Sequence, residues 1–118
     1  PFLAVPAAID FCARHSGPDE AARCAALADV TARRIASRFG LGPAMPAGQG
    51  LRMALAPLPP CDGAAVKAGL FDRHRIEVPV TSFDGRSWLR LSFHVYNDEA
   101  DADALLAALG NMKSLGSR

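Results

Sequence analysis

The sequence has little of what marks several classes of protein. No apolar stretch approaches the ~20 residues of a membrane-spanning helix, so we expect no transmembrane segment. Thirteen Lys and Arg against twelve Asp and Glu leave a net charge of +1. This near-balance excludes nucleic-acid or anionic-membrane binding driven by bulk charge. Residues 1–5 carry no basic segment like that of a secretory signal peptide, so we expect a cytoplasmic protein.

Metal-binding and nucleophile motifs are also missing. The cysteines Cys12, Cys24 and Cys61 show no C-x-x-C spacing, and their odd number indicates reduced thiols that behave as buried or half-buried apolar side chains. None of the three histidines has a second ligand at metal-site spacing, so we expect no metal centre. The sequence contains no phosphate-binding loop, dinucleotide fingerprint or nucleophile elbow. The residues alone therefore define no complete active site.

The length of 118 residues favours one domain over residues 1–118, with a helical lead-in over 1–40 and an α+β part over 44–112. Apolar spacing and turn residues predict helices at 5–15, 18–39, 63–74 and 99–110, and strands at 51–56, 76–80 and 88–95. Asp-Gly within 82–86 predicts a hairpin turn. The order α-α-β-α-β-β-α predicts an α+β fold with a small, mostly antiparallel sheet of three or four strands. The last strand should lie in the middle, with helices on one face.

Alternation along the expected strands divides their side chains between two faces. One face collects the large apolar residues Leu51, Met53, Leu55, Ile76, Val78, Val80, Leu89, Leu91, Phe93 and Val95, and we expect the helices to cover it. The other face collects Arg52, Glu77, Trp88, Arg90, Ser92 and His94.

This mixed face has two interpretations: a solvated sheet surface, or a surface that binds a ligand or partner. Arg90, central in the middle strand, is the best candidate, because a guanidinium offers a planar fork to a carboxylate or phosphate. Its alternative role is a cross-strand ion pair with Glu77.

The segment 55–109 resembles the C-terminal small domain of class-V, fold-type I pyridoxal-phosphate (PLP) enzymes. The resemblance is carried by residues 75–80 (Arg-Ile-Glu-Val-Pro-Val), by residues 89–93 (Leu-Arg-Leu-Ser-Phe), and by Tyr96-Asn97 before an acidic helix start. Residues 2–11 are also similar to the helix that leads into that domain. The family includes aminotransferases, cysteine desulfurases and isopenicillin N epimerase-like proteins, and the epimerase-like branch matches best.

The resemblance implies a role for Arg90, which stands where the family's arginine grips the α-carboxylate of an amino-acid substrate. Glu77, Trp88, Ser92 and His94 are the possible accessory residues on the same face. The loop 81–86 has no cysteine where desulfurases carry their nucleophile, so desulfurase chemistry is not expected.

The resemblance also implies that PLP is held by a large domain that this chain lacks. The two lysines, Lys67 and Lys113, do not follow a histidine as the family's cofactor lysine does. We therefore expect the chain to be the C-terminal third of an enzyme. On its own, this part should be inactive and bind no cofactor. The parent enzyme is expected to be a cytoplasmic homodimer acting by transamination, racemisation or elimination. The alternative is a free-standing α+β module that binds an anionic ligand or a partner protein on its polar sheet face.

Overall fold

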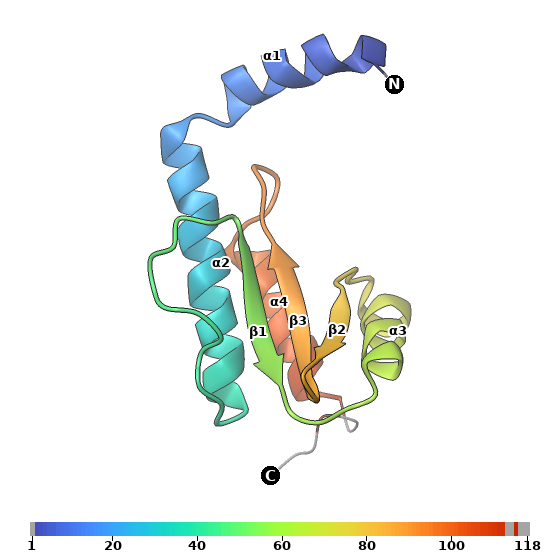
Figure 1. Cartoon of the computed structure of the whole chain (residues 1–118). Helices are drawn as coiled ribbons and strands as arrows, with labels where there is room; N and C mark the ends of the chain where they lie inside the picture. The colour runs from blue at the N-terminus through green and yellow to red at the C-terminus, as the bar shows by residue number, and fades with distance from the viewer. Residues whose placement is uncertain (1, 113–114, 116–118) are drawn as a thin grey trace.

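The structure is a computed structural model that describes residues 2–112 and residue 115. Its elements are η1 (Phe2–Ala4), α1 (Val5–His15), α2 (Pro18–Arg38), β1 (Met53–Leu58), α3 (Gly63–His74), β2 (Val80–Phe83), β3 (Arg86–Ser92) and α4 (Glu99–Gly110). The three strands form one antiparallel sheet in the order β1-β3-β2 (Figure 1). This arrangement confirms the α+β class and the central place of the last strand.

Local capping sets where two of the helices begin. The Asp62 carboxylate accepts hydrogen bonds from the backbone N–H of Ala64 and Ala65, at 3.0 and 3.1 Å, and starts α3. The Asp98 side chain caps α4 by accepting a hydrogen bond from the Asp101 N–H, and the Asp101 carboxylate accepts one from the Asp98 N–H, which completes a capping box. These local signals explain why the predicted ranges 63–74 and 99–110 agree with the structure.

The β2–β3 hairpin turns at Asp84-Gly85, as predicted. Both residues have positive φ, 50° and 67°, as a two-residue type I′ turn requires. The turn fixes the register in which Val80 lies opposite Leu89 and Phe83 opposite Arg86. Register in turn decides which β3 side chains face the helices.

The strand predicted over 76–80 is wrong in its bounds, since β2 begins at Val80. Pro79 has no N–H to donate to a ladder, although its carbonyl still accepts a hydrogen bond from the Arg90 N–H at 3.0 Å. Val78 is nevertheless buried, whereas Glu77 is exposed. The segment before β2 therefore lies beside β3 and keeps the predicted alternation without being a full strand.

The core lies between the sheet and helices α2, α3 and α4. Along α2, Cys24, Ala28 and Ile35 are fully buried and form part of the core. Leu89 and Leu91 of β3 belong to the same core and contribute to it from the sheet. The opposite face of the sheet is not covered by any helix of the described chain (Figure 1).

The predicted face of the first strand is wrong. Leu55 pairs with Arg90 and Met53 with Ser92, and paired residues of antiparallel strands share a face. Both side chains are thus on the uncovered face and remain 38% and 55% exposed. The smaller Ala56 is buried instead, because α2 packs closely on β1 through small side chains.

Helix α1 projects away from the rest of the molecule (Figure 1). Val5 and Ile9, which lie on one face of the helix at helical spacing, are 48% and 62% exposed, and no residue of α1 is buried. Cys12 is also exposed, against the expectation of buried thiols. The apolar pattern of this helix is real, but the described chain offers nothing for it to pack on.

Candidate functional site

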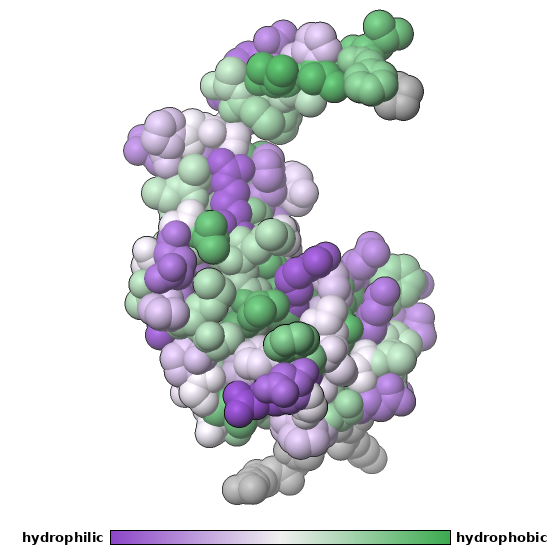
Figure 2. Space-filling view, viewed as in Figure 1, coloured by the Kyte–Doolittle hydropathy of each residue, from purple (hydrophilic) through white to green (hydrophobic). Residues whose placement is uncertain are grey.

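The uncovered face of the sheet is centred on Arg90. We call it the open face and define it by Met53, Leu55, Pro57, Arg86, Trp88, Arg90 and Ser92, which alternation and strand pairing place on one side. Figure 2 shows hydrophilic groups set among hydrophobic ones on this side of the molecule. The Arg90 side chain is exposed, with Leu55 opposite it on β1 and Pro79 beside it.

The guanidinium of Arg90 has no carboxylate partner among the described residues. The ion pairs found there are Arg23–Glu20, Arg33–Asp29 and Arg34–Asp103. The alternative role of Arg90, a cross-strand pair with Glu77, is therefore not formed. The strand holds the backbone of Arg90 in place, and the guanidinium of its side chain is open to an incoming anion.

Arg52, predicted on the same face as Arg90, lies elsewhere. It precedes β1 at an alternate position to Met53, and its backbone carbonyl accepts a hydrogen bond from Phe93 at 2.9 Å. Its charge acts on Glu20 of α2. The pKa of the Glu20 carboxyl lies below its ordinary value, mainly because Arg23 donates hydrogen bonds to it, and the charge of Arg52 adds a smaller lowering. Arg52 thus belongs to the α2 side of the molecule.

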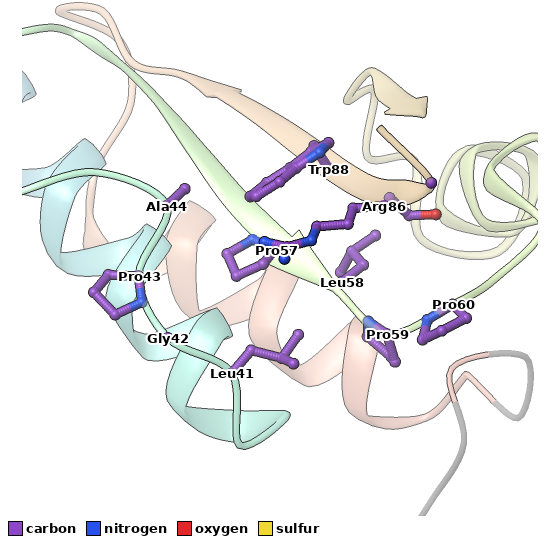
Figure 3. A pocket seen from close by; sticks show the side chains of 12 residues that line it. Leu41, Gly42, Pro43, Ala44, Pro57, Leu58, Pro59, Pro60, Arg86 and Trp88 are labelled. Atoms are coloured by element: carbon purple, nitrogen blue, oxygen red, sulfur yellow. The ribbon is translucent and has the colours of Figure 1, made fainter. Parts of the chain in front are cut away.

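A cavity of about 510 Å³ opens at the hairpin end of this face. Its walls include Arg86 and Trp88 of β3, together with Leu41, Pro43, Pro57, Pro59 and Pro60. The Arg86 side chain extends towards Pro57 on the same side as the Trp88 ring (Figure 3). The Trp88 indole donates a hydrogen bond to the Phe83 carbonyl at 3.4 Å.

Sequence reasoning identified Trp88 but missed Arg86 and the proline wall. The cavity forms only when Pro57 pairs with Trp88 across β1 and β3, and no local pattern gives that register. Alternation extended by one step from Trp88 would have placed Arg86 on the same face.

The structure separates the remaining accessory candidates. Ser92 is exposed at the end of β3, on the face of Arg90. His94 lies beyond the strand in the following loop, half-buried, with its ring centroid 5.4 Å from that of Tyr96. Its Nδ1 is buried without a hydrogen-bond partner among the described residues. Strand alternation no longer applies there, so His94 is not aligned with Arg90 as predicted.

The residues described do not fit a PLP site. Lys67 is exposed on α3, on the helix side of the sheet, and Lys113 lies outside the described residues. The N-termini of α3 and α4 could otherwise hold a phosphate, but Asp62 and Asp98 already occupy them. The expectation that the chain alone binds no cofactor stays a prediction.

Among residues 2–112 and 115, no three His, Cys, Asp or Glu side chains lie close enough together to hold a metal ion. None of the helices in that part is both long and apolar enough to cross a membrane.

The sequence of the chain is similar to those of two known proteins. No protein-family model matches the chain. Over 112 residues it is 42% identical to the isopenicillin N epimerase of Amycolatopsis lactamdurans and 36% identical to that of Streptomyces clavuligerus. Each match covers 92% of this chain and 28% of the relative, so the chain spans less than a third of either relative's length. These matches confirm the resemblance to the isopenicillin N epimerase-like branch that residues 75–97 indicate.

Proposed function

We propose that the chain is the C-terminal part of an epimerase- or aminotransferase-like enzyme that acts on an amino-acid-type substrate, and that Arg90 binds the substrate's α-carboxylate. The observation that carries the proposal is the exposed guanidinium of Arg90 at the centre of the open face, which has no ion pair within the described part of the chain. The 42% identity to an isopenicillin N epimerase supports the class of enzyme.

Arg90 is suited to orienting a carboxylate. Its backbone is held on both sides, by β1 and by the hydrogen bond to Pro79. A guanidinium can form two parallel hydrogen bonds to one carboxylate, which fixes the direction of the bound group as well as its position. Leu55 and Trp88 flank Arg90 with apolar surface. When a second surface covers this face, the lower local dielectric strengthens the pairing.

The apolar surface that the chain leaves uncovered supports its being part of a larger assembly. Met53 and Leu55 are large apolar side chains on the open face. Elements η1 and α1 form an arm that projects from the molecule, and on it Phe2, Leu3 and Ile9 are 90%, 96% and 62% exposed. Figure 2 shows strongly hydrophobic surface along that arm. Soluble domains seldom leave such groups clustered and exposed unless another surface covers them.

The proposed enzyme uses PLP, which activates the substrate's Cα–H bond when bound, and residues outside this chain would hold it. Within this chain, the role of Arg90 is to bind and orient. The family resemblance further suggests a cytoplasmic homodimer. Groups outside this chain would set the reaction type, which is transamination, racemisation or elimination.

The test is the Arg90→Lys variant in the enzyme that contains this chain, with Arg73→Lys on α3 as the matched control. We expect Arg90→Lys to lower kcat/KM at least roughly tenfold, because lysine cannot form the paired hydrogen bonds of a guanidinium. Arg73 is exposed on another element, so its replacement should leave kcat/KM unchanged. Wild-type kcat/KM in Arg90→Lys would overturn the proposal.

The second candidate is a free-standing module that binds an anion on the open face, and the exposed side chain of Arg90 favours it. The two candidates differ in the coding sequence upstream of residue 1. An open frame of a few hundred codons that encodes a His-Lys pair would support the enzyme. A start codon directly before Pro1 would support the module.

A further inference from the structure

We propose that Tyr96 is an anchor residue of the interface with the part of the enzyme that lies outside this chain, and that Arg23 is the positioning residue that holds its turn. The inference rests on the proposed function, because it takes the chain as one part of a longer enzyme. The size of the relatives supports this, since the match covers only 28% of each. Most of such an enzyme therefore lies outside this chain and is available to cover Tyr96.

Tyr96 lies in the turn between β3 and α4, and its side chain is 79% exposed. The His94 ring lies beside it, with the two ring centroids 5.4 Å apart, and still leaves most of Tyr96 uncovered. A tyrosine joins a large apolar ring to a hydroxyl that can form a hydrogen bond, and tyrosine is enriched at protein interfaces for this reason. The exposed ring therefore suits contact with a second protein surface.

The turn that carries Tyr96 is closed by its own hydrogen bonds. The Asn97 N–H donates to the His94 carbonyl at 2.9 Å, and the His94 N–H donates to Oδ1 of Asn97 at 3.0 Å. Nδ2 of Asn97 donates to the Asp101 carboxylate at 3.1 Å, which ties the turn to the start of α4. Because the backbone around Tyr96 is already ordered, binding a partner there loses less conformational entropy.

Arg23 ties the same turn to α2. Its Nη2 donates to the Asn97 carbonyl at 3.0 Å, across a separation of 74 residues in the sequence. Its Nε donates to both carboxylate oxygens of Glu20 at 3.0 Å, which holds the guanidinium in the direction of the turn. A surface ion pair of this kind contributes little stability by itself, so the arrangement is better suited to positioning than to stabilising the fold.

The turn and the apolar arm lie at the same end of the molecule. Arg23, which reaches the turn, is close to the start of α2, and α1 leads into that start (Figure 1). Ile9 and Phe11 of α1 are 62% and 46% exposed. A surface that covers this end therefore meets apolar groups on a projecting helix and one aromatic side chain on a fixed turn. Well-packed aromatic side chains carry much of the binding energy of an interface, so Tyr96 is the expected anchor.

The experiment measures the rate at which tetranitromethane nitrates Tyr96 in the 118-residue chain and in the enzyme that contains it. Tyr96 is the only tyrosine of the chain, and the tryptic peptide 91–113 reports its nitration by mass spectrometry. We expect nitration at least roughly tenfold slower in the enzyme, because an anchor residue is desolvated at its interface.

Variants of the enzyme test the role of Arg23. Arg23→Gln should raise the nitration rate of Tyr96 several-fold, because the turn loses its tie to α2. Arg23→Lys keeps a donor for the Asn97 carbonyl and should raise the rate less. Arg33→Gln is the matched control, since Arg33 lies on the same helix and pairs with Asp29 instead, and it should leave the rate unchanged.

The outcomes separate this inference from the proposed function. Equal nitration of Tyr96 in the chain and in the enzyme would overturn the interface, whereas kcat/KM of Arg90→Lys decides the proposed function independently. Protection that appears in the chain alone and rises with its concentration would mean that a second copy covers Tyr96, and would also overturn the proposal. An unchanged rate in Arg23→Gln, or an equal rise in Arg33→Gln, would overturn the positioning role of Arg23.

Discussion

Replacing Arg90 by alanine should leave the free energy of unfolding nearly unchanged. The side chain is exposed and has no ion pair within the described part of the chain, so its removal opens no cavity and strands no buried charge. Surface substitutions of this kind stay within about 0.5 kcal/mol. This expectation separates a binding residue from a structural one.

The neighbouring residue gives the matched control. Leu89 is 0% exposed and faces the helices from the same strand. Leu89→Ala should cost about 3 kcal/mol, because it removes buried apolar area and leaves a cavity in the core. For a domain of this size, that corresponds to a fall in Tm of roughly 12 °C.

The assay is urea unfolding followed by far-UV circular dichroism, which does not depend on Trp88. The reasoning is refuted if Arg90→Ala costs more than about 1 kcal/mol, since Arg90 would then support the fold. A cost of less than about 1 kcal/mol for Leu89→Ala would instead contradict the division of β3 into a buried and an open face.

Three further outcomes follow from local features. Gly85→Ala should lower the free energy of unfolding by about 1–2 kcal/mol in thermal melts, because its φ of 67° is strained for any residue with a Cβ; no loss would contradict the type I′ turn. The pKa of the Glu20 carboxyl is lower in the folded protein than in the unfolded chain, so ionised Glu20 stabilises the fold. This stabilisation is fully present above the unfolded pKa and is lost as the pH falls through the folded pKa. Unfolding measured from about pH 5 to 3 should therefore show a weaker acid dependence in Glu20→Gln, and an unchanged dependence would refute the link. Leu3→Ser with Ile9→Ser should change the free energy of unfolding by less than about 0.5 kcal/mol in urea, since both side chains are exposed; a larger loss would mean that α1 packs on its own chain.

The parts of the fold that the sequence predicted well depend on signals within a few residues. Asp62 and Asp98 each cap the helix that follows, and Asp84-Gly85 is the turn pair that a two-residue hairpin favours. Such interactions are complete within one turn of chain, so reading the sequence locally is enough to find them.

The parts that were missed depend on contacts between distant segments. The boundary of β2 depends on whether Pro79 can join a ladder beside β3. Arg86 joins the site only because β1 and β3 pair in a register that brings Pro57 to Trp88. Such contacts are set by the packing of the whole chain, and no short window of sequence contains them.

The inverted face of β1 shows how the site and the fold constrain each other. A rule that turns the larger side chains inward would bury Met53 and Leu55, yet the structure buries Ala56. Alanine on β1 lets α2 lie close to the sheet, and the same alternation must then turn the larger residues outward. They lie beside Arg90, whose charge has no ion pair among the described residues. Apolar groups around one open guanidinium disfavour a free, solvated surface and favour a carboxylate site that is completed when another surface closes over it.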